Sequence, residues 1–492
     1  MRKIFSIVCL LLVAVAAMPC TNLIVGKKAS ADGSVIISYS SDSYGMFSSL
    51  YYKPRMKHAK GAMRPVYHYE TSNYLGEIPE AEETYQVTGF LNEYQLSIME
   101  TTFGGRPELD GGPGIMDYGS LMWIALERCK TAREAIKLID ELCQKYGYQC
   151  SGESFTIADK NEVWIMEMIG KGVGVKGAVW VAVRIPDDCI SAHANQARIH
   201  QFPLNDKENC LYSPDVISFA REKGYFSGLN KDFSFANAYA PLDFGARRYC
   251  EARVWSFYNM FTDRGEEFLP YILGSTDKPM PLYVKAKKRI SVQEIQQAMR
   301  DHYEGTPMDM TKDLGAGGHG VPYRWRPMSW KVDEKTYVNE RATATQQTGF
   351  WMVGQARPEK TGILWFGMDD AATSCLTPIY CNTTAVPECM AEGNGSMLEY
   401  TPTSAFWLFN RVAHFKYLFY NRVIGDIQKV QKELETSYQE QVKATDAKAL
   451  SMIENSKEET IAFLTDFSSQ AGQNTFRRWK ELDNFLLVKY LD

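Results

Sequence analysis

Strand-like and helix-like segments occur in separate blocks along this chain, and that order restricts the folds open to it. Some short runs are rich in β-branched and aromatic residues, whereas apolar residues recur at helical spacing elsewhere. Blocks in the order strands, helices, strands, helices favour an α+β fold built around antiparallel sheets. The strand blocks cover residues 21–40, 84–103, 154–192 and 349–381, and the helical blocks cover residues 117–145 and, as three stretches, 402–490.

The first block predicts a β-hairpin directly after Cys20. Residues 21–25 and 35–39 are β-prone, and residues 31–34 contain an Asp-Gly turn signal. A turn centred near residue 31 would place Asp42 opposite Cys20 at the open end of the hairpin. Two more hairpins are expected further along, with residues 159–162 and 186–188 as their turns.

The first 19 residues have the pattern of a secretory signal. Arg2 and Lys3 give a short positive start, and an apolar stretch over residues 4–17 ends in small residues. No later run of about 18 apolar residues occurs, which favours an exported periplasmic or extracellular protein over one that stays inserted in a membrane. The alternative is an uncleaved anchor.

Charge and cysteine spacing narrow the classes of function. The 492 residues carry a formal net charge of −5 and no long Lys/Arg run, which argues against nucleic acid as a partner. None of the eleven cysteines forms a CxxC pair or a zinc pattern, and Asp309, Asp313 and His319 fit no standard metal spacing. We therefore expect no metal and no cofactor. The sequence leaves open whether the cysteines form disulfides or are buried thiols.

Cys20 has two features of an N-terminal nucleophile. It lies near the expected processing point of the leader and immediately before the first predicted strand. Once the preceding residues are removed, it carries both a thiol and an α-amine, and the amine's reference pKa of about 7.7–8.0 lets it act as a base near neutral pH. Cleavage at the small residues of the leader would leave Met18 and Pro19 in place, so we expect self-cleavage of the Pro19–Cys20 bond. We expect Asp42 to orient the amine and the thiol, with a solvated loop Asp as the alternative.

The stretch Cys-Thr-Asn-Leu-Ile-Val-Gly-Lys-Lys-Ala-Ser-Ala-Asp-Gly-Ser, which begins at Cys20, resembles the opening of the C69 family of dipeptidases, N-terminal-nucleophile hydrolases related to the secernins. The resemblance implies a four-layer αββα sandwich, metal-free cleavage of dipeptides and broad side-chain tolerance. One departure concerns Ser-Ser-Asp-Ser-Tyr at residues 40–44, which keeps Asp42 but lacks the basic residue that relatives often carry there. Weaker matches follow in the expected order at residues 101–106, 125–135, 152–159, 191–199 and 362–367.

Other polar residues are candidates for the same site. By resemblance to N-terminal-nucleophile hydrolases, the Asn195 amide would donate to the oxyanion, with a turn Asn as the alternative. Arg198 could bind a substrate carboxylate or form a salt bridge. Thr101 could line the cleft or be an ordinary strand residue, and His193 is expected to be packed or exposed rather than catalytic.

Together these features predict an exported thiol dipeptidase that cleaves small peptides through an acyl-enzyme on Cys20. The alternatives are an N-acyl amide hydrolase of the same mechanism, a non-catalytic lipoprotein anchored through Cys20, and an inactive binding module on the same fold. The chain could also form a homo-oligomer. The expected parts are a signal peptide or propeptide at residues 1–19, a hydrolase core at 20–400 with a loop-rich insertion near 212–330, and C-terminal helices at 401–492 that pack on the core.

Overall fold

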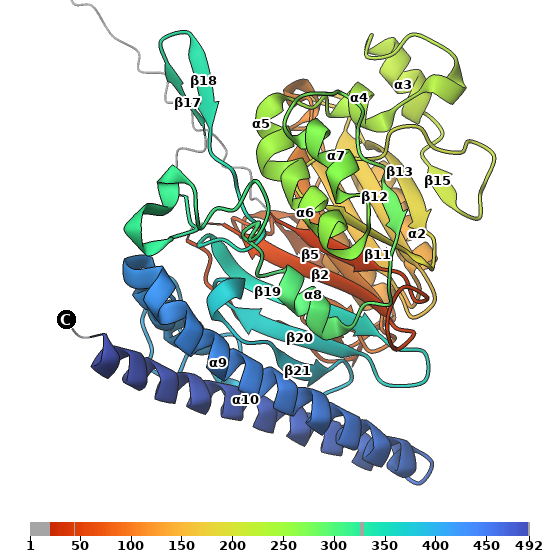
Figure 1. Cartoon of the computed structure of the whole chain (residues 1–492). Coiled ribbons are helices and arrows are strands. Elements are labelled where there is room, and N and C mark those ends of the chain that lie inside the picture. Colours follow the sequence, from red (N-terminus) through yellow and green to blue (C-terminus); the bar gives the residue numbers. More distant parts are fainter. Residues whose placement is uncertain (1–19, 44, 325–328, 491–492) are drawn as a thin grey trace, which may run out of the picture.

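Two large antiparallel sheets form the centre of the molecule (Figure 1). The computed structural model describes residues 20–43, 45–324 and 329–490, so the predicted leader lies outside the described residues. Sheet I, in spatial order, contains β16 (Tyr283–Lys285), β14 (Cys189–His193), β1 (Asn22–Val25), β2 (Val35–Asp42), β19 (Thr348–Ala356), β20 (Ile363–Met368) and β21 (Thr377–Tyr380). Sheet II contains β15 (Cys210–Tyr212), β13 (Ala178–Ile185), β12 (Val163–Gly170), β11 (Gly152–Ala158), β10 (Ser97–Gly104), β9 (Leu91–Asn92), β8 (Val87–Thr88) and β3 (Tyr52–Lys53).

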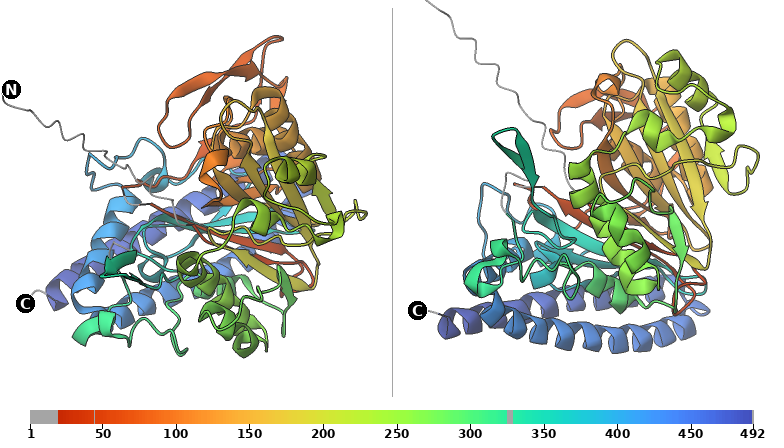
Figure 2. Two further views of the ribbon diagram at one scale, coloured as in Figure 1. Left: turned by 90° about the horizontal axis from the view of Figure 1, so that it is seen from above. Right: turned by 45° about the horizontal axis from the view of Figure 1, so that its top comes forward.

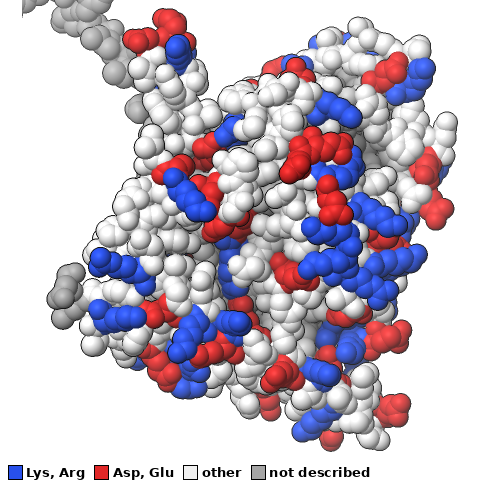
Figure 3. Space-filling model, viewed as in Figure 1, with Lys and Arg blue, Asp and Glu red and all other residues white. Residues whose placement is uncertain are grey.

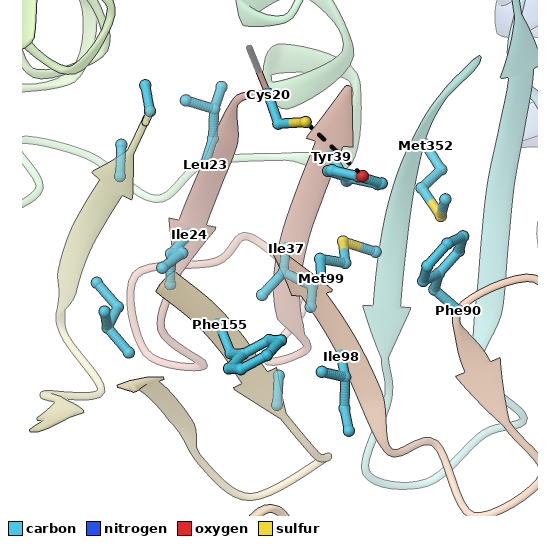
Figure 4. Packing of buried hydrophobic residues seen from close by; sticks show 14 of the residues in the cluster. Cys20, Leu23, Ile24, Ile37, Tyr39, Phe90, Ile98, Met99, Phe155 and Met352 are labelled. Atoms are coloured by element: carbon cyan, nitrogen blue, oxygen red, sulfur yellow. Dashed lines mark hydrogen bonds between the residues drawn. The ribbon is translucent and has the colours of Figure 1, made fainter. Parts of the chain in front are cut away.

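The two sheets face each other across an apolar layer. Strands β1 and β2 of sheet I lie against β10 and β11 of sheet II. Figure 4 shows Ile24 and Ile37 from the first pair close to Ile98 and Phe155 from the second. All four side chains are buried, and full burial of such a side chain contributes about 1.5–3 kcal/mol. This apolar contact fixes the position of the residues at the upper end of the sheets, where Cys20 lies.

Helices cover the outer faces of both sheets (Figure 2). Sheet II is covered by α1 (Tyr118–Arg128) and α2 (Ala132–Tyr146), and the Thr131 side chain caps α2 by accepting from Glu134 N–H. On sheet I, α6 (Ala252–Phe261) contacts β14 and α8 (Val292–Ala298) contacts β19. The shorter elements are α3 (Val216–Glu222), α4 (Phe235–Tyr239), α5 (Phe244–Ala246), α7 (Gly265–Ile272) and the strand pairs β4 (Met56–Lys57) with β7 (Glu83–Thr84), β5 (Met63–Tyr67) with β6 (Tyr74–Pro79), and β17 (Ser329–Val332) with β18 (Lys335–Val338).

The C-terminal region forms two long helices rather than three separate stretches. Helices α9 (Ala405–Ile453) and α10 (Lys457–Lys489) lie side by side along sheet I near β20 and β21 (Figure 1). The backbone of Phe419 leaves the helical region inside α9, at φ −142° and ψ 54°. That kink divides α9 without ending it. The helices bond to the sheet edge, because Ser468 accepts from the backbone N–H of Tyr380 at 3.1 Å.

The first predicted hairpin is present, with its register shifted by one residue. Thr21 pairs with Ser40, so Ser41, rather than the predicted Asp42, lies opposite Cys20. Contacts outside the hairpin hold its loop, since the backbone N–H of Ala31 donates to the carbonyl of Ile290 at 2.8 Å. The prediction used the turn residues alone and did not include this contact.

The expected hairpin around residues 186–188 is wrong, whereas the one around residues 159–162 is confirmed by the pairing of β11 with β12. Strand β13 belongs to sheet II, and β14 pairs with β1 and β16 in sheet I. The connection crosses between the sheets because Asp187 O accepts from the backbone of Lys28 and Ala29. Gly26 permits this close approach, since a Cβ there would lie 2.5 Å from Asp187 O.

The surface carries charges of both signs. On the face in Figure 3, Lys and Arg side chains are interspersed with Asp and Glu. Among the described residues, no helix has the length and apolar character needed to cross a membrane.

Candidate active site

Cys20 lies two residues before β1, and its thiol is fully buried. Its side chain points toward Tyr39 of β2 (Figure 4). Sγ lies 3.8 Å from Tyr39 Oη and 3.7 Å from Glu100 Oε1, and it accepts from the backbone N–H of Asp42. Burial raises the pKa of the Cys20 thiol well above its usual value, and the charges of Glu100 and Asp42 raise it further. The thiol is therefore neutral at pH 7 in this environment and needs a base to react.

Two buried carboxyl groups lie beside this thiol. Glu100 on β10 and Glu153 on β11 are diagonal neighbours, because Glu153 pairs with Thr102, two residues after Glu100. Tyr39 Oη donates to Glu100 Oε1, and Thr102 Oγ1 donates to Glu153 Oε2 at 2.8 Å. Burial raises the pKa of both carboxyl groups, and the charge of Glu100 further raises the pKa of Glu153. The pair therefore tends to retain a proton.

Asp42 lies next to Cys20, and its carboxylate has its own partners. Arg341 Nη2 donates to Oδ2, Thr348 Oγ1 donates to Oδ1 at 2.6 Å, and Ser40 Oγ donates to Oδ2 at 3.1 Å. Residues 40–44 contain no basic partner for Asp42. Arg341 provides one from the segment that precedes β19, about 300 residues further along the chain. Burial raises the pKa of Asp42, and the positive charge of Arg341 opposes that rise.

Arg253 on α6 connects the nucleophile to Asn195. Its Nη1 donates to the Cys20 carbonyl at 2.5 Å and to Thr21 Oγ1 at 2.8 Å. Its Nη2 donates to Asn195 Oδ1 at 3.0 Å and to the Ala194 carbonyl at 3.2 Å. Burial and the neighbouring Arg341 lower the pKa of Arg253 to about 10, so the guanidinium remains charged at neutral pH. The positive charge of Arg253 thus lies between Cys20 and Asn195.

The predicted oxyanion residue, Asn195, lies in this cluster. Its backbone is left-handed, at φ 59°, a conformation that Asn tolerates better than most residues. Nδ2 donates to the Thr102 carbonyl at 2.8 Å, while Oδ1 accepts from Arg253. The amide is therefore held in one orientation, which is what a hydrogen-bond donor to an oxyanion requires.

The two predicted substrate-binding residues are buried in structural contacts. Thr101 Oγ1 bonds to His193 Nδ1 at 2.7 Å, and burial lowers the pKa of His193 to about 3, which keeps that ring neutral. Arg198 pairs with Glu251 at 3.0 Å and donates to the Ala192 carbonyl at 2.8 Å. The structure thus places neither side chain beside Cys20 Sγ, and their contact with substrate stays a prediction.

Two cavities adjoin the cluster. One, of about 400 Å³, is lined by Thr102, Asn195, Arg253 and Arg341, among others. The other, of about 710 Å³, has an aromatic wall. Tyr39 contacts that wall edge-on, with ring centroids 5.6 Å from Phe90 and 5.7 Å from Phe350. The aromatic lining residues are Phe47, Tyr51, Tyr67, Tyr69, Phe90, Trp123, Phe350 and Phe366.

The structure adds residues to the site that sequence reasoning missed. Tyr39, Glu100, Glu153, Arg253 and Arg341 come from five distant segments and meet only in the folded chain. The sequence does contain one indication of Glu100. It is a single acidic residue within a strand of otherwise apolar or hydroxyl-bearing residues, Ile-Met-Glu-Thr-Thr. Among the described residues, all ten cysteines are unpaired and no group of three or more His, Cys, Asp or Glu side chains is arranged to hold a metal.

Comparison with known proteins assigns the family. The model of peptidase family C69 matches residues 19–433, which include Cys20 and every site residue named above. The chain belongs to peptidase family C69. This family membership supports peptide-bond hydrolysis as the activity of the C69 peptidase described here.

Named relatives of this C69 peptidase extend over most of its length. It is 27% identical to a protein named "Probable dipeptidase" from Salmonella dublin, over 71% of this chain and 80% of the relative. It is 26% identical to another "Probable dipeptidase", from Latilactobacillus sakei, over 91% of this chain and 90% of the relative. Identity to "Dipeptidase A" from Lactobacillus helveticus is 23%, over 83% of this chain and 84% of the relative.

Proposed function

We propose that this peptidase is an exported thiol dipeptidase of the N-terminal-nucleophile type, with Cys20 as both nucleophile and, through its α-amine, base. The names of the relatives support dipeptides as the substrate class. The single observation that carries the mechanism is the position of Cys20: a buried thiol two residues before a central strand, flanked by Asp42, Arg253 and Asn195. Two facing sheets with helices outside agree with the sandwich expected of this type.

The electrostatics of the thiol explain why processing would be needed. With its pKa raised by burial and by nearby carboxylates, Cys20 is a poor nucleophile as an internal residue. Cleavage of the Pro19–Cys20 bond would create an α-amine on the same residue, with a reference pKa near neutrality. The amine takes the thiol proton, and the resulting ammonium lies beside the carboxylate of Asp42.

The reaction then proceeds by acyl transfer. The thiolate attacks the scissile carbonyl carbon, and the electron pair moves to the carbonyl oxygen, which Asn195 stabilises by donation from Nδ2. Collapse of the tetrahedral intermediate expels the amine of the second residue, which takes the proton from the Cys20 ammonium. Water, deprotonated by the same amine, attacks the thioester, releases the first residue as an acid and restores the thiol.

The burial of Sγ also bears on the lipoprotein alternative. A lipid-anchor cysteine carries a diacylglyceryl group on its sulfur, which must then face the membrane. Here Sγ is buried and faces Tyr39 and Glu100, which supports a catalytic role over lipid attachment. No observation favours an acylated amine over a peptide as substrate.

The function is tested on protein purified from the exported fraction. Intact-mass analysis is expected to show a chain that begins at Cys20, and the protein is expected to hydrolyse unmodified dipeptides without added metal. Alkylation with iodoacetamide should abolish turnover and label Cys20. Full activity from a chain that still begins at Met18 would falsify the role of the α-amine.

A further inference from the structure

The Glu100–Glu153 pair is not explained by the acyl-transfer steps. Glu100 is 2% exposed and Glu153 1% exposed, and neither forms an ion pair with a Lys or Arg among the described residues. The two carboxyl groups hydrogen-bond to each other, and within the same part of the chain no other donor reaches Oε2 of Glu100 or Oε1 of Glu153. A buried carboxylate without a cation or a full set of donors is unfavourable, so such a pair is expected where a ligand completes it.

The chemistry of the missing partner follows from what surrounds the pair. Tyr39 and Thr102 already occupy one oxygen of each carboxyl group. With the proton that the pair retains, the two remaining oxygens carry one negative charge. Once that proton leaves, both oxygens accept hydrogen bonds only. A primary ammonium supplies three donors and a positive charge, which matches two acceptors side by side.

The distance to the nucleophile identifies which ammonium fits. In a peptide, the α-nitrogen of a residue lies roughly 2.5 Å from that residue's own carbonyl carbon, as backbone bond lengths require. The carbonyl carbon lies roughly 3–3.5 Å from the attacking atom in a reactive complex. Glu100 Oε1 is 3.7 Å from Cys20 Sγ, so the α-ammonium of the residue under attack can reach the Glu100 carboxyl group.

The larger cavity leads toward this pair. Tyr69 lines that cavity, and it lies close enough to Glu100 and Cys20 for their charges, after burial, to raise the pKa of its phenol. Tyr69 thus separates the aromatic space from the carboxyl pair and the thiol, which lie behind the lining of the cavity.

From this geometry we propose that Glu100 and Glu153 bind the free α-ammonium of the substrate's first residue, which makes an unblocked N-terminus the recognised feature. The proposal rests on the proposed dipeptidase function and gives that site its substrate class. It separates a dipeptidase from an acylase, because an acylated nitrogen has no charge and would leave the carboxyl pair buried without a partner.

The test measures binding apart from turnover. The probes are a dipeptide analogue whose scissile amide is replaced by a ketomethylene group, and the same analogue with an acetylated amine. Calorimetry on the purified exported protein is expected to show that acetylation weakens binding by roughly 10- to 100-fold, the range of a charge-assisted hydrogen bond. In Glu100→Gln that preference should fall to within about 3-fold, through weaker binding of the free amine alone.

Two further variants make the result decisive. Glu153→Gln changes the pair without contacting Cys20, and it should lower the preference in the same direction even if Glu100→Gln folds poorly. Glu359→Gln, at an exposed residue lining a separate cavity, should keep the full preference. Equal affinity of the wild-type protein for both probes overturns the ammonium site, as does an equal loss for both probes in Glu100→Gln.

Turnover of an ordinary dipeptide is measured in parallel. A wild-type protein that prefers the free-amine probe and hydrolyses no dipeptide would contradict the proposed function and leave the ammonium site standing. A protein that hydrolyses dipeptides and binds both probes equally would do the reverse.

Discussion

Buried charges are treated differently in two regions of this molecule. Between α9 and sheet I, two buried acids face bases: Glu435 forms two bonds with Arg300, at 2.5 and 3.0 Å, and Asp370 pairs with Lys416. Beside Cys20, Glu100 and Glu153 face each other instead. Complete pairing characterises a structural contact, whereas incomplete pairing beside a nucleophile characterises a site that awaits a substrate.

Removing a thiol from each region should give the largest contrast. Cys20→Ala is expected to lower kcat/KM for dipeptides at least ~10⁴-fold, since no other group forms the acyl-enzyme, and to leave the Pro19–Cys20 bond intact. Cys375→Ala, at an equally buried thiol near Glu435, should retain full activity and lose only about 1 kcal/mol of stability. Steady-state kinetics, intact mass and urea unfolding measure these effects. Comparable activity losses in the two variants would remove the distinction.

Replacing one acid by its amide in each region compares how much the two acids contribute to the free energy of unfolding. Glu435→Gln leaves Arg300 buried without a counter-charge and should cost about 3–5 kcal/mol of unfolding free energy. Glu153→Gln should change stability by less than about 1 kcal/mol, or raise it, because an amide N–H can donate to the unpaired oxygen of Glu100. Urea unfolding at pH 7 compares the two. A similar loss in both would show that the carboxyl pair is a stabilising contact.

The Asn195 amide offers a change confined to the reaction. Asn195→Asp keeps a side chain that tolerates the left-handed backbone and can accept from Arg253, but it removes the Nδ2–H donor. We expect kcat to fall about 10²–10³-fold with a small change in KM. Asn195→Gly, which also tolerates that backbone, removes the donor and the acceptor together. The difference in kcat between the Asp and Gly variants therefore measures the contribution of the acceptor. An unchanged kcat in Asn195→Asp would exclude the oxyanion role.

A third buried acid, Glu167, has hydrogen-bond donors but, among the described residues, no base as a partner, and it predicts a smaller effect, a dependence of the unfolding free energy on pH. Glu167 on β12 accepts from the backbone N–H groups of Arg198 and Ile199, yet burial dominates and raises its pKa to about 7. A carboxyl group with a raised pKa in the folded state stabilises the protein at low pH. This contribution is fully present below about pH 4.5 and is lost as the pH rises to about 7, by at most about 1.4 kcal/mol per pH unit. Urea unfolding across that range should show the slope, and Glu167→Gln should flatten it.

Local pattern predicted much of the fold. Runs of β-prone residues located β1 and β2, and apolar residues at helical spacing located α1 and α2. The sheet to which β14 belongs could not be predicted, since a Pro-Asp-Asp turn fits a hairpin as well as a crossing. The contacts of Asp187 with the β1–β2 loop decide between them, and these are not local in sequence.

The site likewise contains residues that local pattern could place and residues that it could not. Cys20 and Asp42 lie on one hairpin, so their proximity followed from local pairing, even with the register shifted by one residue. Arg253 and Arg341 reach the same point from positions more than 200 residues later. Only the packing of α6 and the segment before β19 onto sheet I brings these charges to the thiol, and no spacing in the sequence encodes that packing.

Arg253 determines how the attacking and stabilising groups move. One guanidinium donates to the carbonyl of Cys20 and, through its other nitrogen, to the side-chain oxygen of Asn195. A displacement of α6 would therefore move the Cys20 carbonyl and the Asn195 side chain in the same direction. Because both bonds go to one planar guanidinium, the distance between the Cys20 carbonyl and the Asn195 side chain is restrained.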